Sequence, residues 1–143
     1  MDMLVDARYR LRLAEGFAVE PRQDLETHRW RSCVDSSQLA VENAAKVALA
    51  LLGPVGRTHD PSALLRMAVA DGRFPPEAIP RVERLADCAQ LLGPEVHIRS
   101  DYGDQDTRRT PWELFDEADA VRALAMAEDA TAEAQELLQG WPP

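Results

Sequence analysis

The chain has 143 residues and an apolar fraction of 45%, which fits one globular domain over residues 1–143 and excludes wholesale disorder. Its formal net charge of −9 opposes generic binding to a phosphate backbone, so we expect no DNA partner. No signal peptide and no bilayer-length apolar run is apparent, so we expect a cytoplasmic protein without membrane contact.

The first expected helix covers residues 2–28, because small and apolar residues recur at helical spacing. Pro21 falls inside this pattern, removes a backbone donor and clashes with the preceding turn. We therefore expect a kink near Ala18 to Pro21, or two helices with a tight joint. Asp24 or Thr27 is the expected cap of the helix that follows.

The central helix is expected over residues 29–52, a stretch without Gly or Pro that is rich in Ala, Leu and Val. Its apolar face recurs at steps of three, four or seven residues. The members of that face are Trp30, Val34, Val41, Ala45, Ala48 and Leu52. We expect this helix to organise the fold.

A polar ridge formed by Gln38, Glu42, Asn43 and Lys46 runs along the same helix, and Glu42 and Lys46 form a favourable i,i+4 pair. One interpretation is a ligand-binding cleft in which Lys46 faces an anion. The alternative, which the pattern favours, is an ion pair and an amide that fix the register against a neighbouring helix or subunit.

A third helix is expected to begin at Pro61 after an Asp60 cap, and a fourth runs from Pro75–Pro76 to Gly93. His59 and Asp60 are more typical of a turn with a capping Asp than of a catalytic pair. His59 can still reach the central helix and form a hydrogen bond there.

Residues 95–110 form a long polar stretch that we expect to be an irregular loop between the fourth and fifth helices. His97, Arg99, Asp101 and Tyr102 offer acid–base, phosphate-clamping and stacking chemistry. They indicate either a pocket for phosphate, base or partner, or a solvated loop whose Tyr packs onto the core. The last helix is expected from a capping box at residues 110–113 to Gln139.

The predicted fold is thus all-α, an antiparallel bundle of about five helices with that polar loop. Cys33 and Cys88 are interpreted as small buried residues. The three His are well separated in sequence and fit no common metal site, so no metal and no cofactor is expected.

The helix segment from Gln38 to Lys46 resembles the second-helix signature of the HEPN family, in which Gln, Ala, Glu, Ala and Lys alternate in this order. The His59–Asp60 pair is similar to the His-Asp that members carry before the third helix. His97 and the run Asp101–Asp104 resemble the "RYPD"-type segment of a prokaryotic branch. The resemblance covers residues 7–138.

That resemblance implies a helical domain that forms homodimers and is often paired with a minimal nucleotidyltransferase in toxin–antitoxin-type systems. Many members are ribonucleases that use an Arg followed a few residues later by a His, and two such motifs meet across the dimer. Here the nearest Arg before His97 is Arg84, which is too distant, and Arg22 with His28 matches the spacing only around the first-helix Pro.

The sequence therefore favours nucleotide or partner binding without that motif, with Gln38, Glu42, Lys46, His59, Asp101 and Tyr102 as ligand-binding candidates. The alternative is a metal-independent endoribonuclease. In it, His97 would act as acid or base and Arg99 would stabilise the developing phosphorane.

Overall fold

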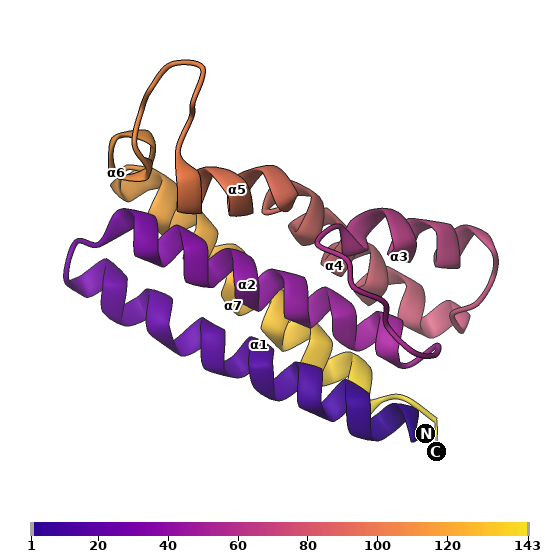
Figure 1. The fold of residues 1–143 in the computed structure, drawn as a ribbon. Coiled ribbons are helices and arrows are strands. Elements are labelled where there is room, and N and C mark those ends of the chain that lie inside the picture. The colour runs from indigo at the N-terminus through magenta and orange to yellow at the C-terminus, as the bar shows by residue number, and fades with distance from the viewer. Residues whose placement is uncertain (1, 143) are drawn as a thin grey trace.

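The computed structural model describes residues 2–142, which form helices joined by short connections (Figure 1). In chain order these are α1 (Met3–Glu26), α2 (Trp30–Ala50), α3 (Pro61–Ala70), the 3-10 turn η1 (Pro76–Ala78), α4 (Ile79–Leu91), α5 (Pro94–Tyr102), α6 (Pro111–Leu114) and α7 (Glu117–Gln139). Residues 2–142 contain no β-strand, although Asp104 and Arg109 form an isolated bridge. The predicted all-α fold is confirmed.

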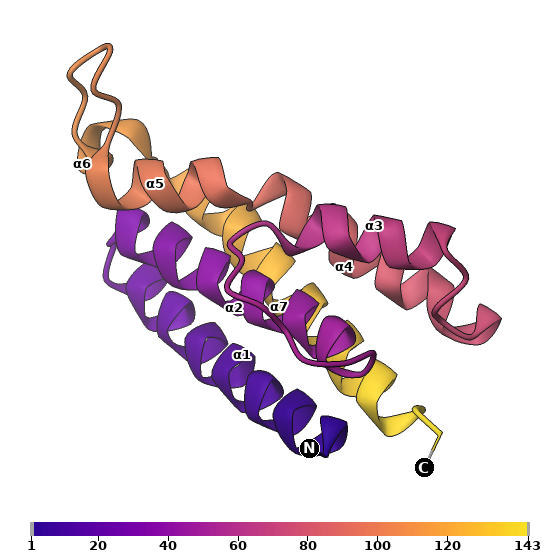
Figure 2. The same ribbon diagram turned by 45° about the vertical axis from the view of Figure 1, so that its right-hand side comes forward.

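Three long helices, α1, α2 and α7, lie side by side and form the body of the molecule (Figures 1 and 2). Helix α1 runs antiparallel to α2, and α7 runs parallel to α2. Their contacts are built largely from small residues, with fully buried Ala7 and Ala14 on α1 and a seam of alanines on α7. Because alanine adds little bulk, the three backbones can approach closely along their length.

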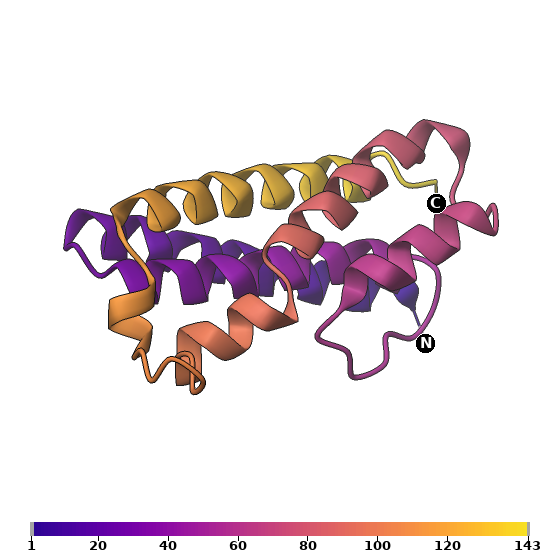
Figure 3. The same cartoon turned by 90° about the horizontal axis from the view of Figure 1, so that it is seen from above.

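Helices α3, α4 and α5 form a second layer over α2, and Figure 3 shows this layer beside the three long helices. Helix α5 lies against α2 and runs in the opposite direction (Figure 1). Gly93 separates α4 from α5, and Pro94 begins α5 at its first turn. Helix α2 contacts the other two long helices on one side and the second layer on the other. This central position agrees with the prediction that α2 organises the fold.

The stretch from residue 95 is helical where an irregular loop was expected, because α5 extends to Tyr102. Glu95 in its first turn and Arg99 in its last complement the helix dipole, and their side chains are 4.0 Å apart. Only Ser100 is fully buried, so α5 has no apolar stripe that periodicity could detect. The irregular loop is confined to residues 103–110, which project from the body (Figure 1).

The last helix was also expected as one element and is instead divided. The predicted capping box at Thr110 and Glu113 is present, but it begins the short α6. Phe115 is extended, and a second capping box between Asp116 and Asp119 begins α7. The last long helix therefore begins at Glu117 rather than at Pro111, because Asp116 acts as an N-cap inside the predicted helical pattern.

Helix α1 continues through Pro21 to Glu26, so of the two expected alternatives, a kink or a division into two helices, the division is wrong. Asp24 lies inside α1 and Thr27 is its C-cap, so neither residue caps α2. The N-cap of α2 is Arg29, whose side chain forms an ion pair with Asp24 at 3.3 Å. Cys33 and Cys88 are buried, as predicted. Every helix within residues 2–142 is too short or too polar to cross a lipid bilayer.

Candidate functional site

Polar side chains follow one side of α2 for more than half of its length. They recur at steps of three or four residues, which keeps them in a single row. The row, here called the polar stripe, consists of Arg31, Asp35, Gln38, Glu42 and Lys46. Its C-terminal members Gln38, Glu42 and Lys46 are at most 7% exposed, whereas Arg31 and Asp35 are partly exposed.

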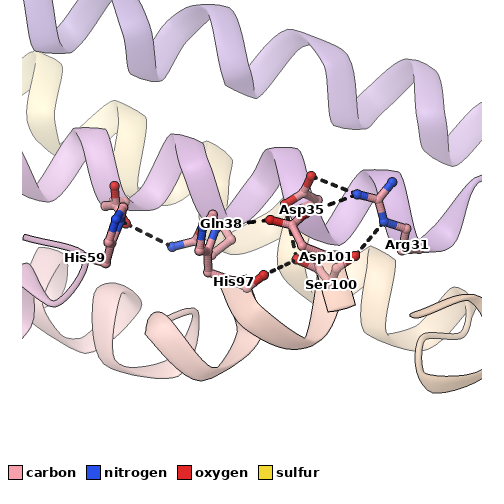
Figure 4. A network of polar contacts seen from close by, with 8 residues as sticks. Arg31, Asp35, Gln38, His59, His97, Ser100 and Asp101 are labelled. Atoms are coloured by element: carbon pink, nitrogen blue, oxygen red, sulfur yellow. Dashed lines mark hydrogen bonds and ion pairs between the residues drawn. The ribbon is translucent and has the colours of Figure 1, made fainter. Parts of the chain in front are cut away.

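Two segments distant in sequence cover the stripe. Helix α5 contributes His97, Ser100 and Asp101, and the connection before α3 contributes His59 (Figure 4). The pattern on α5 places residues 97, 100 and 101 on the side that faces α2, because steps of three and four share a helix face. The predicted contact between His59 and the central helix is confirmed by its bond to Glu42.

Glu42 is the centre of the buried half of the stripe and accepts hydrogen bonds through both carboxylate oxygens. Its Oε2 accepts from Lys46 Nζ at 3.2 Å. Its Oε1 lies 3.5 Å from Gln38 Nε2 and 3.3 Å from His59 Nδ1. An ionised carboxylate only accepts, so both nitrogens donate. The Glu42–Lys46 pair is a buried ion pair, because its two side chains are 6% and 9% exposed.

The orientation of the Gln38 amide determines which ring nitrogen of His97 carries the hydrogen. Because the amide nitrogen of Gln38 faces Glu42, its Oε1 faces His97 Nδ1 at 3.2 Å. An amide oxygen only accepts, so His97 Nδ1 carries a hydrogen. The other ring nitrogen, Nε2, is left with a lone pair in the neutral imidazole.

The two imidazoles form a pair above the stripe. His59 and His97 stack with ring centroids 5.3 Å apart and planes 13° from parallel. Each is held through Nδ1 by an α2 side chain, so neither Nε2 is used in these bonds, and Nε2 of His97 lies 3.8 Å from Asp101 Oδ2. The side chain of His59 is 69% exposed, so solvent reaches one side of the pair.

The outer half of the stripe binds the C-terminal turn of α5. Arg31 donates from Nε to the Ser100 carbonyl at 2.6 Å, and from Nη2 to Asp35 Oδ2 at 3.1 Å and Asp101 Oδ1 at 3.3 Å. The Ser100 hydroxyl donates to Asp35 Oδ1 at 3.1 Å. Partial burial, followed by the negative charge of Asp101, raises the pKa of Asp35 above its ordinary value.

Asp35, His97 and Asp101 come together at this end although the sequence analysis expected no metal site. One potential ligand atom from each of the three lies within 4.8 Å of the other two. His97 and Asp101 share α5 at a spacing of four, and Asp35 is contributed by α2. This spatial set is invisible in the sequence because Asp35 and His97 are far apart along the chain.

Arg99 and Tyr102 lie on a different side of α5. Together with Ile98 and residues 103–106 they line a shallow groove that does not include His97. Tyr102 is 72% exposed, so it does not pack onto the core. Of the candidates within 95–102, the structure therefore brings His97 and Asp101 to the stripe but not Arg99 or Tyr102.

The Arg residues considered for an Arg–His motif have other partners. Arg84 on α4 donates to Glu133 of α7 at 3.0 Å. Arg22 bonds Glu128 at 2.7 Å, while His28 stacks on Trp30. The guanidinium that reaches the neighbourhood of His97 belongs to Arg31, through its ion pair with Asp101.

Sequence reasoning missed Arg31, Asp35 and Ser100. The sequence pattern could have indicated Arg31 and Asp35, because they continue the polar ridge of α2 toward its N-terminus at the same spacing. No sequence pattern indicated Ser100, because its contact with α2 depends on the helical conformation of α5, in which Ser100 is fully buried.

A family model described as "HEPN domain" matches residues 7–137 of the chain. No curated protein matches the sequence. The matched span includes the whole polar stripe, His59 and the residues of α5.

Proposed function

The chain belongs to the HEPN family, and on that premise we propose that it binds a nucleotide across the His59–His97 pair without using an Arg–His ribonuclease motif. The observation that carries this proposal is the anchoring of both imidazoles through Nδ1, which leaves each Nε2 free to meet a ligand. A protonated Nε2 donates to phosphate oxygens, and the exposed face of His59 offers a surface on which a base can stack.

Local charge favours the His59 end of the stripe for the phosphates. Asp35 and Asp101 place two carboxylates near His97 at the outer end, and among residues 2–142 the guanidinium paired with both is that of Arg31. At the His59 end, Lys46 balances Glu42. Since the whole chain carries a formal charge of −9, we expect moderate affinity that weakens as salt rises.

Homodimer formation and pairing with a minimal nucleotidyltransferase, in a toxin–antitoxin-type system, remain part of the proposal. The exposed side of α5 supports a protein contact, because Ile98 and Tyr102 are one turn apart and 54% and 72% exposed. Arg99 lines the same groove and adds a charge that a partner can recognise. In this proposal Tyr102 and Arg99 serve the partner, and the two histidines serve the nucleotide.

The test is a titration of the full chain with ATP, GTP and AMP in the presence of EDTA. We expect saturable binding that His59→Ala and His97→Ala each weaken by about tenfold or more, in line with the loss of a charge-assisted hydrogen bond. His28→Ala is the matched control, because His28 is exposed and stacks on Trp30 away from the stripe. The absence of saturable binding, together with no complex with a co-expressed nucleotidyltransferase, would reject the proposal.

A second candidate, a metal-independent endoribonuclease, is favoured by the two imidazoles themselves. Two histidines 5.3 Å apart can act as general acid and general base in transesterification of RNA. This candidate predicts growth arrest on expression that His97→Ala relieves, and Arg99→Ala tests whether that guanidinium contributes. Intact RNA after incubation with the purified protein, and normal growth, would eliminate it.

A further inference from the structure

The contact between α2 and α5 contains two acceptor atoms that face each other. His97 Nε2 lies 3.8 Å from Asp101 Oδ2, which is too long for a hydrogen bond. Neutral His97 has a lone pair at Nε2, because the Gln38–Glu42 arrangement assigns the hydrogen to Nδ1. A lone pair that faces a carboxylate oxygen is satisfied by a group placed between them, either a metal cation or a water molecule that donates to both atoms.

Asp35 completes a set of three ligands around that point. Its carboxylate oxygen, His97 Nε2 or Nδ1 and an Asp101 oxygen lie within 4.8 Å of one another. For a tetrahedral ion with bonds of about 2.1 Å, two ligand atoms lie roughly 3.4 Å apart, so small side-chain rotations would close the set. The three side chains are 21–32% exposed, so an ion has a path from solvent.

The surroundings resemble the outer shell of a metal site. His97 donates its other ring hydrogen to Gln38, the arrangement that fixes the tautomer of metal-binding histidines. Ser100 and Arg31 orient the two carboxylates through hydrogen bonds. Arg31 offsets one of the two negative charges, so the set still attracts a dication. A carboxylate oxygen has two lone pairs and can accept from a donor while it binds an ion.

We propose that Asp35, His97 and Asp101 bind one divalent transition-metal ion of the Zn²⁺ class, with water in the remaining positions. A mixed set of one imidazole and two carboxylates favours Zn²⁺, Co²⁺ or Ni²⁺ over Mg²⁺ and Ca²⁺, which prefer oxygen alone. The ion would join α5 to α2, because the ligands come from both helices. The argument for this ion does not rest on nucleotide binding, but both ligands would use His97 Nε2, so the ion and a phosphate on His97 would exclude each other.

The experiment uses the full chain, freed of metal with EDTA and then titrated with Zn²⁺ by calorimetry and with Co²⁺ by visible absorption. We expect one ion per chain and a rise in Tm of at least about 3 °C under saturating Zn²⁺. His97→Ala and Asp101→Asn should each weaken binding tenfold or more, a scale typical of altered metal sites. Asp101→Asn preserves the side-chain shape at a partly exposed position, so it tests the site even if His97→Ala fails to fold.

His28→Ala is the matched control and should bind Zn²⁺ as the wild type does, because His28 stacks on Trp30. No saturable binding, or equal affinity in wild type and Asp101→Asn, would overturn the proposal in favour of a water molecule between His97 and Asp101. A loss in His59→Ala equal to that in His97→Ala would place the ion between the imidazoles and would also overturn it. Because the nucleotide titration is done in EDTA, the two proposals fail independently.

Discussion

The two sides of α2 differ in what they bury, since one side is mainly apolar and the other carries the polar stripe. Toward α1 and α7 the helix buries mainly alanines and valines against further alanines, and Ser37 is the fully buried polar residue there. Toward α5 it buries Gln38, Glu42 and Lys46, which satisfy one another and receive His59 and His97. The apolar side can stabilise many helix arrangements, whereas the polar side stabilises only the arrangement in which each donor meets its acceptor.

The apolar side and the polar side of α2 therefore have distinct roles in the fold. Apolar burial is non-directional and supplies most of the free energy of folding. The polar stripe contributes less to stability but fixes where α5 and the residues before α3 lie. We therefore expect substitutions on the polar side to show coupling between residues, and substitutions on the apolar side to follow side-chain volume.

The largest expected effect is in Glu42→Gln. This change leaves Lys46 buried without a counter-charge, since Glu42 is its ion-pair partner. Removing one member of a buried pair lowers the free energy of unfolding by about 3–5 kcal/mol. Urea unfolding monitored by circular dichroism measures the loss.

The matched control for that change is the double variant Glu42→Gln with Lys46→Met. It removes both charges and should recover a large part of the lost stability. If the double variant is as unstable as the sum of the two single variants, the stripe is not an interacting unit and the contrast between the sides of α2 is wrong.

On the apolar side, Ala127→Leu tests the close packing of α7. Ala127 is fully buried, and a larger side chain there must displace neighbouring helices. Overpacking of this kind costs about 1–3 kcal/mol. The Tm from calorimetry reports the loss, and Val121→Leu, at a position 48% exposed on the same helix, should leave the Tm nearly unchanged.

An effect of similar size but confined to one connection is expected in Gly103→Ala, at the end of α5. Gly103 has φ of 77°, and an added Cβ would lie 2.3 Å from the Arg109 carbonyl oxygen. Strain at such a position costs of order 1–3 kcal/mol, and it should be confined to the connection over residues 103–110. Hydrogen exchange should therefore quicken at Gly103 and Arg109 but not in the interior of α1, α2 or α7.

The smallest expected difference is between the reaction rates of the two thiols, Cys33 and Cys88. Burial raises the pKa of both Cys33 and Cys88 to about 11, so few thiolates exist at pH 8. Reaction with a disulfide reagent at pH 8 should be slow in the native protein and fast after unfolding. Cys33 is fully buried in the long-helix layer and Cys88 is 8% exposed on α4, so Cys88 should react first. The reverse order would mean that the long-helix layer opens more readily than the second layer.

The sequence predicts the apolar side of α2 better than the polar side. Helical spacing, proline at first turns and glycine at ends are local signals, and they indicated α2, α3 and α4 close to their observed limits. Helix α5 was not predicted, because it is stabilised by tertiary polar contacts at His97 and Ser100 rather than by an apolar stripe. Within the candidate site, Gln38, Glu42 and His59 were identified, but the convergence of Asp35 with Asp101 depends on how α5 lies on α2.

The unbroken row from Arg31 to Lys46 also constrains how this chain can change in length. One residue inserted near Ser37 would rotate the following turns of α2 by about 100°. Glu42 and Lys46 would then swing toward α1 or α7, and alanines that now separate the long helices would meet the histidines. A point replacement along α2 changes one contact, whereas a single-codon insertion or deletion there would move the whole C-terminal half of the polar stripe away from α5.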